Sequence, residues 1–146
     1  MSLEEIQPGL KHRHSIVVDE SLTVPAVSKA FSSFADMPPV FATAFLVGFA
    51  EWTCIEALRP YLSPDQRTVG VHVDLSHSGA TPVGMTVTAE VELVAVEGRR
   101  LRFKVTCNDD VEVVSEGHHE RYIIDMPRFM DRLARKGARP LTEGVG

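Results

Sequence analysis

The sequence is poor in basic residues and has no long hydrophobic run. Its 15 Lys and Arg residues stand against 20 Asp and Glu residues, which gives a formal net charge of -5. Binding to nucleic acid depends on clustered positive charge, so nucleic acid is not expected as a partner. The most apolar stretch, residues 40–50, ends at Glu51. That is well short of the roughly 20 residues that a membrane-spanning helix needs, so no membrane partner is expected.

Cysteine is also scarce, because the chain has only Cys54 and Cys107. Their separation matches no metal-binding or redox spacing, so we expect no metal and no cofactor. The N-terminal residues lack the basic segment and apolar segment of a signal peptide, which predicts a cytoplasmic protein. In that compartment two buried thiols are expected, with a disulfide as the alternative.

The composition is that of a chain with a hydrophobic core. Of its 146 residues, 44% are hydrophobic and 24% are charged. This balance is typical of globular proteins, and the length suits one core. We therefore expect residues 1–146 to form one domain, with a flexible tail from about 137 to 146.

A buried helix is predicted for residues 40–58, after a double proline that ends the preceding loop. The segment is apolar on nearly all sides, which is typical of a helix covered by other elements. Its aromatic residues recur at helical spacing: Phe41, Phe45, Phe49 and Trp52. A second, short surface helix is predicted for residues 127–136, which carry apolar residues on one side and basic residues on the other.

Five segments favour β structure, several of them by alternation of apolar and polar residues. They are residues 11–19, 68–76, 86–96, 101–108 and 111–124. The order is one strand, the buried helix, and then four strands that we expect to form a meander. The predicted fold class is α+β, with a five-stranded antiparallel sheet wrapped around a long central helix. One such sheet leaves part of the helix uncovered, which predicts at least a homodimer.

Glu51 is the only charged residue between positions 40 and 55. An unpaired carboxylate in apolar surroundings costs several kcal/mol, so its presence needs a reason. One reading is a catalytic carboxylate. The alternative is that Glu51 faces a wet subunit interface or pairs with an arginine.

Two other polar residues are candidates for the same site. Thr43 precedes Glu51 by eight residues, which places the two side chains roughly 12 Å apart along a regular helix. They cannot touch, and Thr43 alone could equally be a helix cap. His77 follows a predicted strand and could transfer protons near neutral pH, although a lone His at a strand end is common. Gly70 within a strand indicates a close approach of a ligand or, equally, a simple bulge.

Five sequence motifs resemble the fluoroacetyl-CoA thioesterase family of the hot-dog superfamily, and the likeness covers most of the chain. They are VFAT at 40–43, VGFAEWTC at 47–54, VDLSHSGAT at 73–81, VEGRRL at 96–101 and GHHER at 117–121. The resemblance implies a hot-dog fold and hydrolysis of a small acyl-CoA thioester. It also implies a catalytic set of Thr43, Glu51 and His77, with two members on the central helix.

The same resemblance implies an apolar lid before the helix, to which Phe34 and Met37 belong. The fluoroacetyl-specific enzyme has phenylalanine at the position of Met37. A methionine is more adaptable than an aromatic ring, so a broader or different preference for short acyl groups is expected. Gly70, Phe34 and Met37 are thus the candidate substrate-binding residues.

The residues leave several alternatives open. The nucleophile could be Thr43, Glu51 or a water that Glu51 activates. Three arginines could contact the CoA phosphates, although a solvated strand face explains them equally well: Arg99, Arg100 and Arg121. Other functions compatible with the fold are a non-catalytic module that binds acyl-CoA or a small ligand, and a hydratase or dehydratase.

Overall fold

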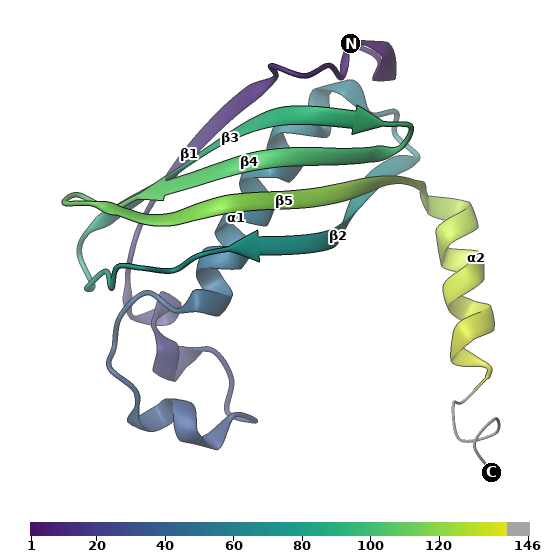
Figure 1. Cartoon of the computed structure of the whole chain (residues 1–146). Helices are drawn as coiled ribbons and strands as arrows, with labels where there is room; N and C mark the ends of the chain where they lie inside the picture. Colours follow the sequence, from purple (N-terminus) through teal and green to yellow (C-terminus); the bar gives the residue numbers. More distant parts are fainter. Residues whose placement is uncertain (140–146) are drawn as a thin grey trace.

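The computed structural model describes residues 1–139. Five strands form one antiparallel sheet, and a long helix lies against one of its faces (Figure 1). The elements are β1 (Lys11–Val17), α1 (Thr43–Leu58), β2 (Gln66–Leu75), β3 (Thr86–Glu97), β4 (Arg100–Asn108), β5 (Val113–Asp125) and α2 (Met126–Gly137). Each expected strand and helix is present, with bounds that differ by up to three residues.

The strand order is β1-β3-β4-β5-β2, so the expected four-strand meander is wrong. Only β3, β4 and β5 follow one another, and β2 pairs with β5 at the far edge of the sheet. The register joins Gln66 to Asp125 and Leu75 to Gly117. Gly117 has φ +152°, and a Cβ there would lie 1.9 Å from the Asp74 carbonyl oxygen. Only glycine therefore fits where β5 passes so close to β2.

Helix α1 begins at Thr43, three residues later than the sequence predicts. The preceding residues are extended because Phe41 bridges Thr23 and Val40 bridges Pro82. Phe41 and several α1 side chains are buried against the inner face of the sheet: Leu46, Phe49, Ala50, Cys54 and Leu58. Alternate residues of the central strands meet them, such as Leu101, Phe103 and Val105, all fully buried. Burying each such side chain contributes about 1.5 to 3 kcal/mol.

The opposite side of α1 is open in the single chain. Trp52 is 41% exposed, although the sequence pattern groups it with the buried aromatics. Edge strand β2 is also apolar and open, with Val71 and Val73 exposed by 44% and 46%. Among the described residues, no strand pairs with the outer side of β2.

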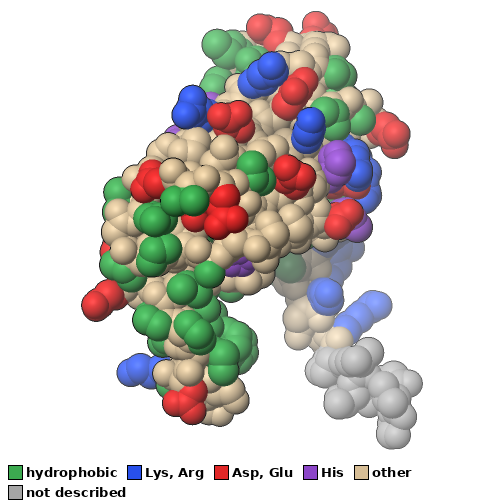
Figure 2. All heavy atoms as spheres, turned by 60° about the vertical axis from the view of Figure 1, so that its left-hand side comes forward, with side chains coloured by type: hydrophobic (Ala, Val, Ile, Leu, Met, Phe, Trp, Pro, Cys, Tyr) green, Lys and Arg blue, Asp and Glu red, His purple; other side chains and the backbone are tan. Residues whose placement is uncertain are grey.

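Three short 3-10 helices lie between β1 and α1: Glu20–Leu22, Val24–Ala26 and Ser32–Asp36. Residues 20–40 form a lobe that projects below the sheet near the start of α1 (Figure 1). Hydrophobic side chains gather on this lobe (Figure 2), and Phe31 and Met37 are among the exposed ones. Apolar groups on the outside of a small lobe indicate a surface that something else covers.

Helix α2 leaves the sheet at the end of β5 and projects away from it (Figure 1). It matches the expected short surface helix, extended by one residue at each end. The expected tail falls mostly on residues 140–146, which lie outside the described part of the chain.

Cys54 and Cys107 are both buried and are not joined by a disulfide. Burial raises the pKa of Cys107 to about 12 and that of Cys54 further, so both stay protonated at neutral pH. In residues 1–139, no helix is long and apolar enough to cross a bilayer.

Candidate functional site

Thr43 and His77 meet at the first turn of α1. The Thr43 hydroxyl oxygen lies 2.7 Å from Nδ1 of His77, which follows the end of β2. His77 is held there because Ser76 and Ser78 bond through their backbone amides to Glu116 and Val114 of β5. Burial lowers the pKa of His77, which keeps the ring neutral at pH 7. Its Nε2 is buried and has no hydrogen-bond partner among the described residues.

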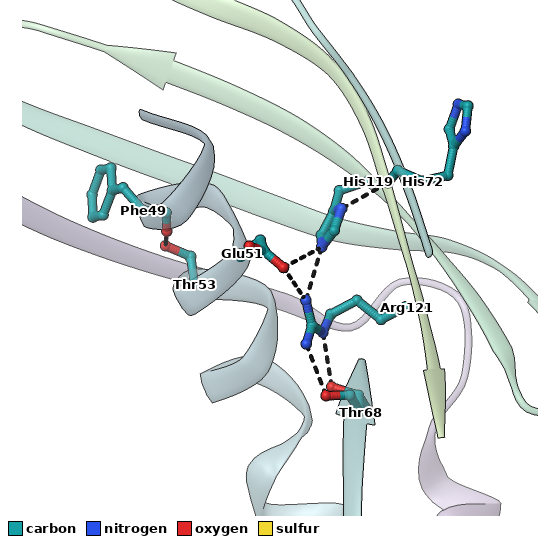
Figure 3. Close-up of polar contacts among 7 residues, drawn as sticks. All are labelled: Phe49, Glu51, Thr53, Thr68, His72, His119 and Arg121. Carbon is teal, nitrogen blue, oxygen red and sulfur yellow. Dashed lines mark hydrogen bonds and ion pairs between the residues drawn. The ribbon is translucent and has the colours of Figure 1, made fainter. Parts of the chain in front are cut away.

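Glu51 lies two turns further along α1 and faces Arg121 of β5 (Figure 3). Its Oε2 accepts a hydrogen bond of 2.8 Å from Arg121 Nη1. The remaining donors of the guanidinium are fixed by Thr68, with Nε bonded to the hydroxyl and Nη2 to the backbone carbonyl, both at 2.8 Å. Arg121 is 3% exposed, whereas the Glu51 side chain is 39% exposed. The carboxylate is therefore paired on one side and open on the other.

His119 supports the arginine from the same face of β5 (Figure 3). Its Nδ1 donates to the His72 carbonyl oxygen at 2.8 Å, so Nε2 of the neutral ring is an acceptor. Arg121 Nη1 lies 3.0 Å from that Nε2 and donates to it. Burial lowers the pKa of His119, and the positive charge of Arg121 lowers it further. The neutral ring thus fixes the guanidinium that holds Glu51.

Gly70 on β2 provides the space for this arrangement. A Cβ at this position would lie 2.7 Å from Glu51 Oε2 and 3.3 Å from Arg121 Nη1. A register shift also occurs between Gly70 and His72. The expected bulge thus adjoins Gly70, and the close approach of a ligand stays a prediction. The group that approaches it within the chain is the Glu51 carboxylate.

The three predicted catalytic residues form two separate groups in the single chain. Thr43 and His77 are in contact, whereas Glu51 is bonded to Arg121. Eight residues of regular helix separate Thr43 from Glu51, which corresponds to roughly 12 Å along the axis. In this arrangement the Glu51 carboxylate is bonded to Arg121 and not to Thr43 or His77.

The expected lid residues lie on the lobe that precedes α1. Phe34 packs edge-on against Phe31, with ring centroids 5.4 Å apart, and Met37 caps the same 3-10 helix. Met37 is 43% exposed. The Met37 side chain is therefore open to solvent, whereas Phe34 is half-buried.

Sequence reasoning missed the roles of Arg121 and His119. Of the three arginines considered for CoA phosphates, Arg99 and Arg100 are exposed to solvent as expected, whereas Arg121 is buried. Arg99 forms an ion pair with Asp125, and Arg100 pairs with Glu120. His119, Arg121 and Ile123 alternate on the buried face of β5. Histidine is fully buried less often than apolar residues are, and arginine only seldom. The presence of His119 and Arg121 on the apolar face of a strand was therefore the signal in the sequence that could have identified these two residues.

A polar hollow of about 590 Å³ lies on the opposite face of the sheet. It is lined by charged residues of both signs, among them Lys11, Arg13, Glu90, Glu92 and Lys104. None of Thr43, Glu51 and His77 lines it. In the described residues, no group of three or more His, Cys, Asp and Glu side chains could hold a metal ion.

Comparison with known proteins identifies the family. Residues 18–127 match the model of the fluoroacetyl-CoA-specific thioesterase family, FlK. The chain belongs to this family. A fluoroacetyl-CoA thioesterase of Streptantibioticus cattleyicolor is 40% identical over 128 residues, which cover 88% of this chain and 92% of that protein.

Solved structures agree with this assignment to the FlK family. A phenylalanine-to-alanine variant of FlK, in complex with fluoroacetate and CoA, superposes with a TM-score of 0.83 at 40% identity. The match covers 85% of this chain and 99% of that one. A hot-dog-like protein from Thermanaerovibrio acidaminovorans has a TM-score of 0.78 at 24% identity, over 91% of this chain and 94% of that one. The expected hot-dog fold and thioesterase class are thus confirmed.

Proposed function

We propose that this protein hydrolyses a short acyl-CoA thioester to the carboxylic acid and CoA, using Thr43, His77 and Glu51. The observation that carries the proposal is the 2.7 Å contact between the Thr43 hydroxyl and His77. A hydroxyl within hydrogen-bond reach of a neutral imidazole is the arrangement of an activated nucleophile. Membership in the FlK family supports the same chemistry.

The reaction begins when Thr43 attacks the thioester carbonyl and His77 accepts the hydroxyl proton. The tetrahedral intermediate expels the CoA thiolate, which takes the proton from the imidazolium, and an acyl ester remains on Thr43. Glu51 then accepts a proton from water as the water oxygen attacks the ester carbon. The second tetrahedral intermediate breaks the bond to Thr43 Oγ, which takes up the proton that Glu51 accepted, and the carboxylic acid leaves with Thr43 and Glu51 restored. Attack by Glu51, or directly by water, is the rival route, and it predicts no adduct on Thr43.

The active enzyme is a homodimer in which two chains join along β2 and the open side of α1. Val71 and Val73 on the edge strand supply apolar surface for this contact. Antiparallel pairing of two β2 strands would also satisfy the backbone groups at the sheet edge. Two α1 helices then lie side by side in opposite directions, which brings the partner's Glu51 toward Thr43 and His77. The site is completed across the interface.

Substrate contacts come from the lobe and from β2. Phe34 and Met37 contact the acyl group, and Gly70 lets the thioester approach the Glu51 carboxylate. The protein needs no cofactor, because CoA is part of the substrate, and it acts in the cytoplasm. The protein cleaves acetyl-CoA and propionyl-CoA in addition to fluoroacetyl-CoA, because the Met37 side chain is more adaptable than an aromatic ring.

The proposed activity is tested by thiol release from acetyl-, fluoroacetyl-, propionyl- and phenylacetyl-CoA. Turnover should fall at least about a hundredfold in Glu51→Gln, Thr43→Ala and His77→Ala, with folding retained. Glu56→Gln on the same helix is the matched control and should keep full activity. Acyl-CoA binding without turnover by the wild type would instead favour a binding module. Rapid-quench mass spectrometry should detect the acyl group on Thr43.

Mixing two inactive variants tests whether the site is shared between subunits. A dimer of one Thr43→Ala chain and one Glu51→Gln chain regains a single intact site only if each site takes Glu51 from the partner. Statistical exchange should then restore about a quarter of wild-type activity. If the mixture stays inactive although heterodimers form, each subunit contains its own complete site.

A further inference from the structure

Helix α2 presents an apolar stripe that nothing in residues 1–139 covers. None of its 12 residues is buried, and Met130 and Leu133 are 51% and 46% exposed. Met126, Phe129, Met130 and Leu133 share one side of the helix at the spacing of an amphipathic surface. The other sides are largely basic, with Arg128, Arg132, Arg135 and Lys136 against the single acidic residue Asp131. The FlK family match ends at residue 127 and leaves almost all of this helix out.

The direction of α2 is fixed by the sheet. It begins next to the start of β2, because Asp125 pairs with Gln66. From there α2 runs past β2 and beyond the edge of the sheet (Figure 1). Its 12 residues span about 18 Å, whereas neighbouring strands are about 4.8 Å apart. The helix is therefore long enough to reach across several strands of a second subunit joined at β2.

In the dimer proposed above, the start of β2 in one chain lies opposite the end of β2 in the other. The end of β2 is the side of the subunit that carries residues 78–85 and the β4–β5 hairpin at 108–113. These two loops are adjacent, since Thr81 bonds to Asp109 and the Thr86 amide bonds to Asp110. The α2 helix of one subunit thus faces this pair of loops on its neighbour.

This surface has the apolar and charged groups that complement α2. It presents exposed valines, with Val111 at 73%, Val83 at 46% and Val113 at 41%. Asp110 and Glu112 are exposed beside them. An apolar centre flanked by acidic groups fits an apolar stripe flanked by arginines, and such charge complementarity favours one partner over others.

We propose that α2 docks on the 78–85 and 108–113 loops of a second copy of this chain, forming an arm that clasps the dimer. The inference rests on the edge-to-edge dimer of the proposed function. The apolar stripe covers the partner subunit's Val83, Val111 and Val113. The basic flank of α2 lies against the partner subunit's Asp110 and Glu112.

A pair of engineered cysteines tests the contact. Leu133→Cys and Val111→Cys in one chain should form a disulfide-linked dimer under mild oxidation. The bond can form only between chains, because β5 separates the two positions by 13 residues, about 40 Å of strand. The native cysteines do not interfere, since both are buried. Asp131→Cys with Val111→Cys is the matched control, because Asp131 lies on the opposite side of α2, and it should not cross-link.

Charge exchange provides a second measurement. Arg132→Glu should raise the dimer dissociation constant by roughly 25-fold, because the symmetric dimer loses two exposed ion pairs of about fivefold each. Adding Glu112→Arg should restore it. The docking of α2 is refuted if sedimentation shows a wild-type dimer, but the cysteine pair does not cross-link and Arg132→Glu leaves the dimer dissociation constant unchanged. That result would leave the proposed edge-to-edge dimer standing. A monomeric wild type refutes the dimer itself. Binding of the wild type to phosphatidylserine vesicles, without cross-linking, would assign α2 to a membrane surface instead.

Discussion

The Thr43 hydroxyl and Nδ1 of His77 lie 2.7 Å apart, although 34 positions separate the two residues in the sequence. The contact depends on the pairing of β2 with β5, which places residues 76–78 beside residues 114–116. Glu51 depends on the same pair of strands, because Thr68 of β2 and Arg121 of β5 bond to each other. Both halves of the proposed site are thus positioned by one strand pair at the edge of the sheet.

Gly70→Ala should reduce turnover with little effect on folding. The added Cβ would lie 2.7 Å from Glu51 Oε2 and displace the carboxylate. A displacement of about 1 Å at a catalytic group can cost a hundredfold in rate. We expect a fall in kcat of at least about tenfold by this reasoning, measured by thiol release. Gly137→Ala, where an added Cβ meets nothing within 4 Å, is the control. Unchanged kcat in Gly70→Ala would argue against a role for the position of Glu51.

Arg121→Met should lower both stability and activity, and Arg121→Lys should rescue only part of the loss. The methionine leaves the Glu51 carboxylate and the Thr68 carbonyl without their donor, which costs about 2 kcal/mol or more. Lysine restores a charge but cannot bond to Thr68 and Glu51 in the same planar arrangement. Urea unfolding and thiol release measure the two effects. Equal behaviour of the lysine variant and the wild type would show that charge alone suffices.

The free energy of unfolding should decrease as the pH falls below about 6.5, the ordinary pKa of histidine. Burial lowers the pKa of His119 in the folded chain, so the unfolded chain binds protons first and is favoured as the pH falls. His119→Gln should weaken this dependence, because the amide can replace both hydrogen bonds and does not titrate. His118→Gln, on the opposite face of β5, is the control. Identical pH profiles for wild type and His119→Gln would contradict the prediction.

Met37→Phe should increase discrimination between fluoroacetyl-CoA and acetyl-CoA. A ring in place of the thioether gives the lobe a more rigid contact surface. The ratio of kcat/KM for the two substrates should rise in the variant while the fold stays unchanged, since Met37 is exposed. Strong preference of the wild type for fluoroacetyl-CoA would refute the broader acyl range that we expect.

Val73→Asp should separate the subunits and abolish turnover together. Val73 is 46% exposed on the edge strand, and a charge there opposes burial in an interface. Sedimentation velocity should show a folded monomer, and thiol release should be lost because the site lacks the partner's Glu51. Val94→Asp is the control, since Val94 is exposed on β3, away from the edge. An active Val73→Asp monomer would place the whole site within one chain.

The elements could be predicted from the sequence, but their neighbours in the sheet could not. Alternation along residues 86–96 and 101–108 reflects one buried face, which is a local property. The pairing of β2 with β5 rather than β3 depends on contacts between distant segments, and alternation carries no information about them. For the same reason Thr43, Glu51 and His77 could be named individually, and the spacing of Thr43 and Glu51 along one helix could be predicted. The contact of Thr43 with His77 and the bond of Glu51 to Arg121 could not, because each joins distant segments.

Residues 20–40 are anchored through isolated bridges, Thr23 with Phe41 at one end and Val40 with Pro82 at the other. Phe31 and Met37 of this lobe are exposed rather than part of the core. Substitutions at such positions change what the lobe presents to a ligand with little cost to folding. Under the proposed function, selection can therefore vary acyl-group preference here while the strand pair that positions the proposed catalytic residues is retained, which makes the lobe the evolvable part of the enzyme.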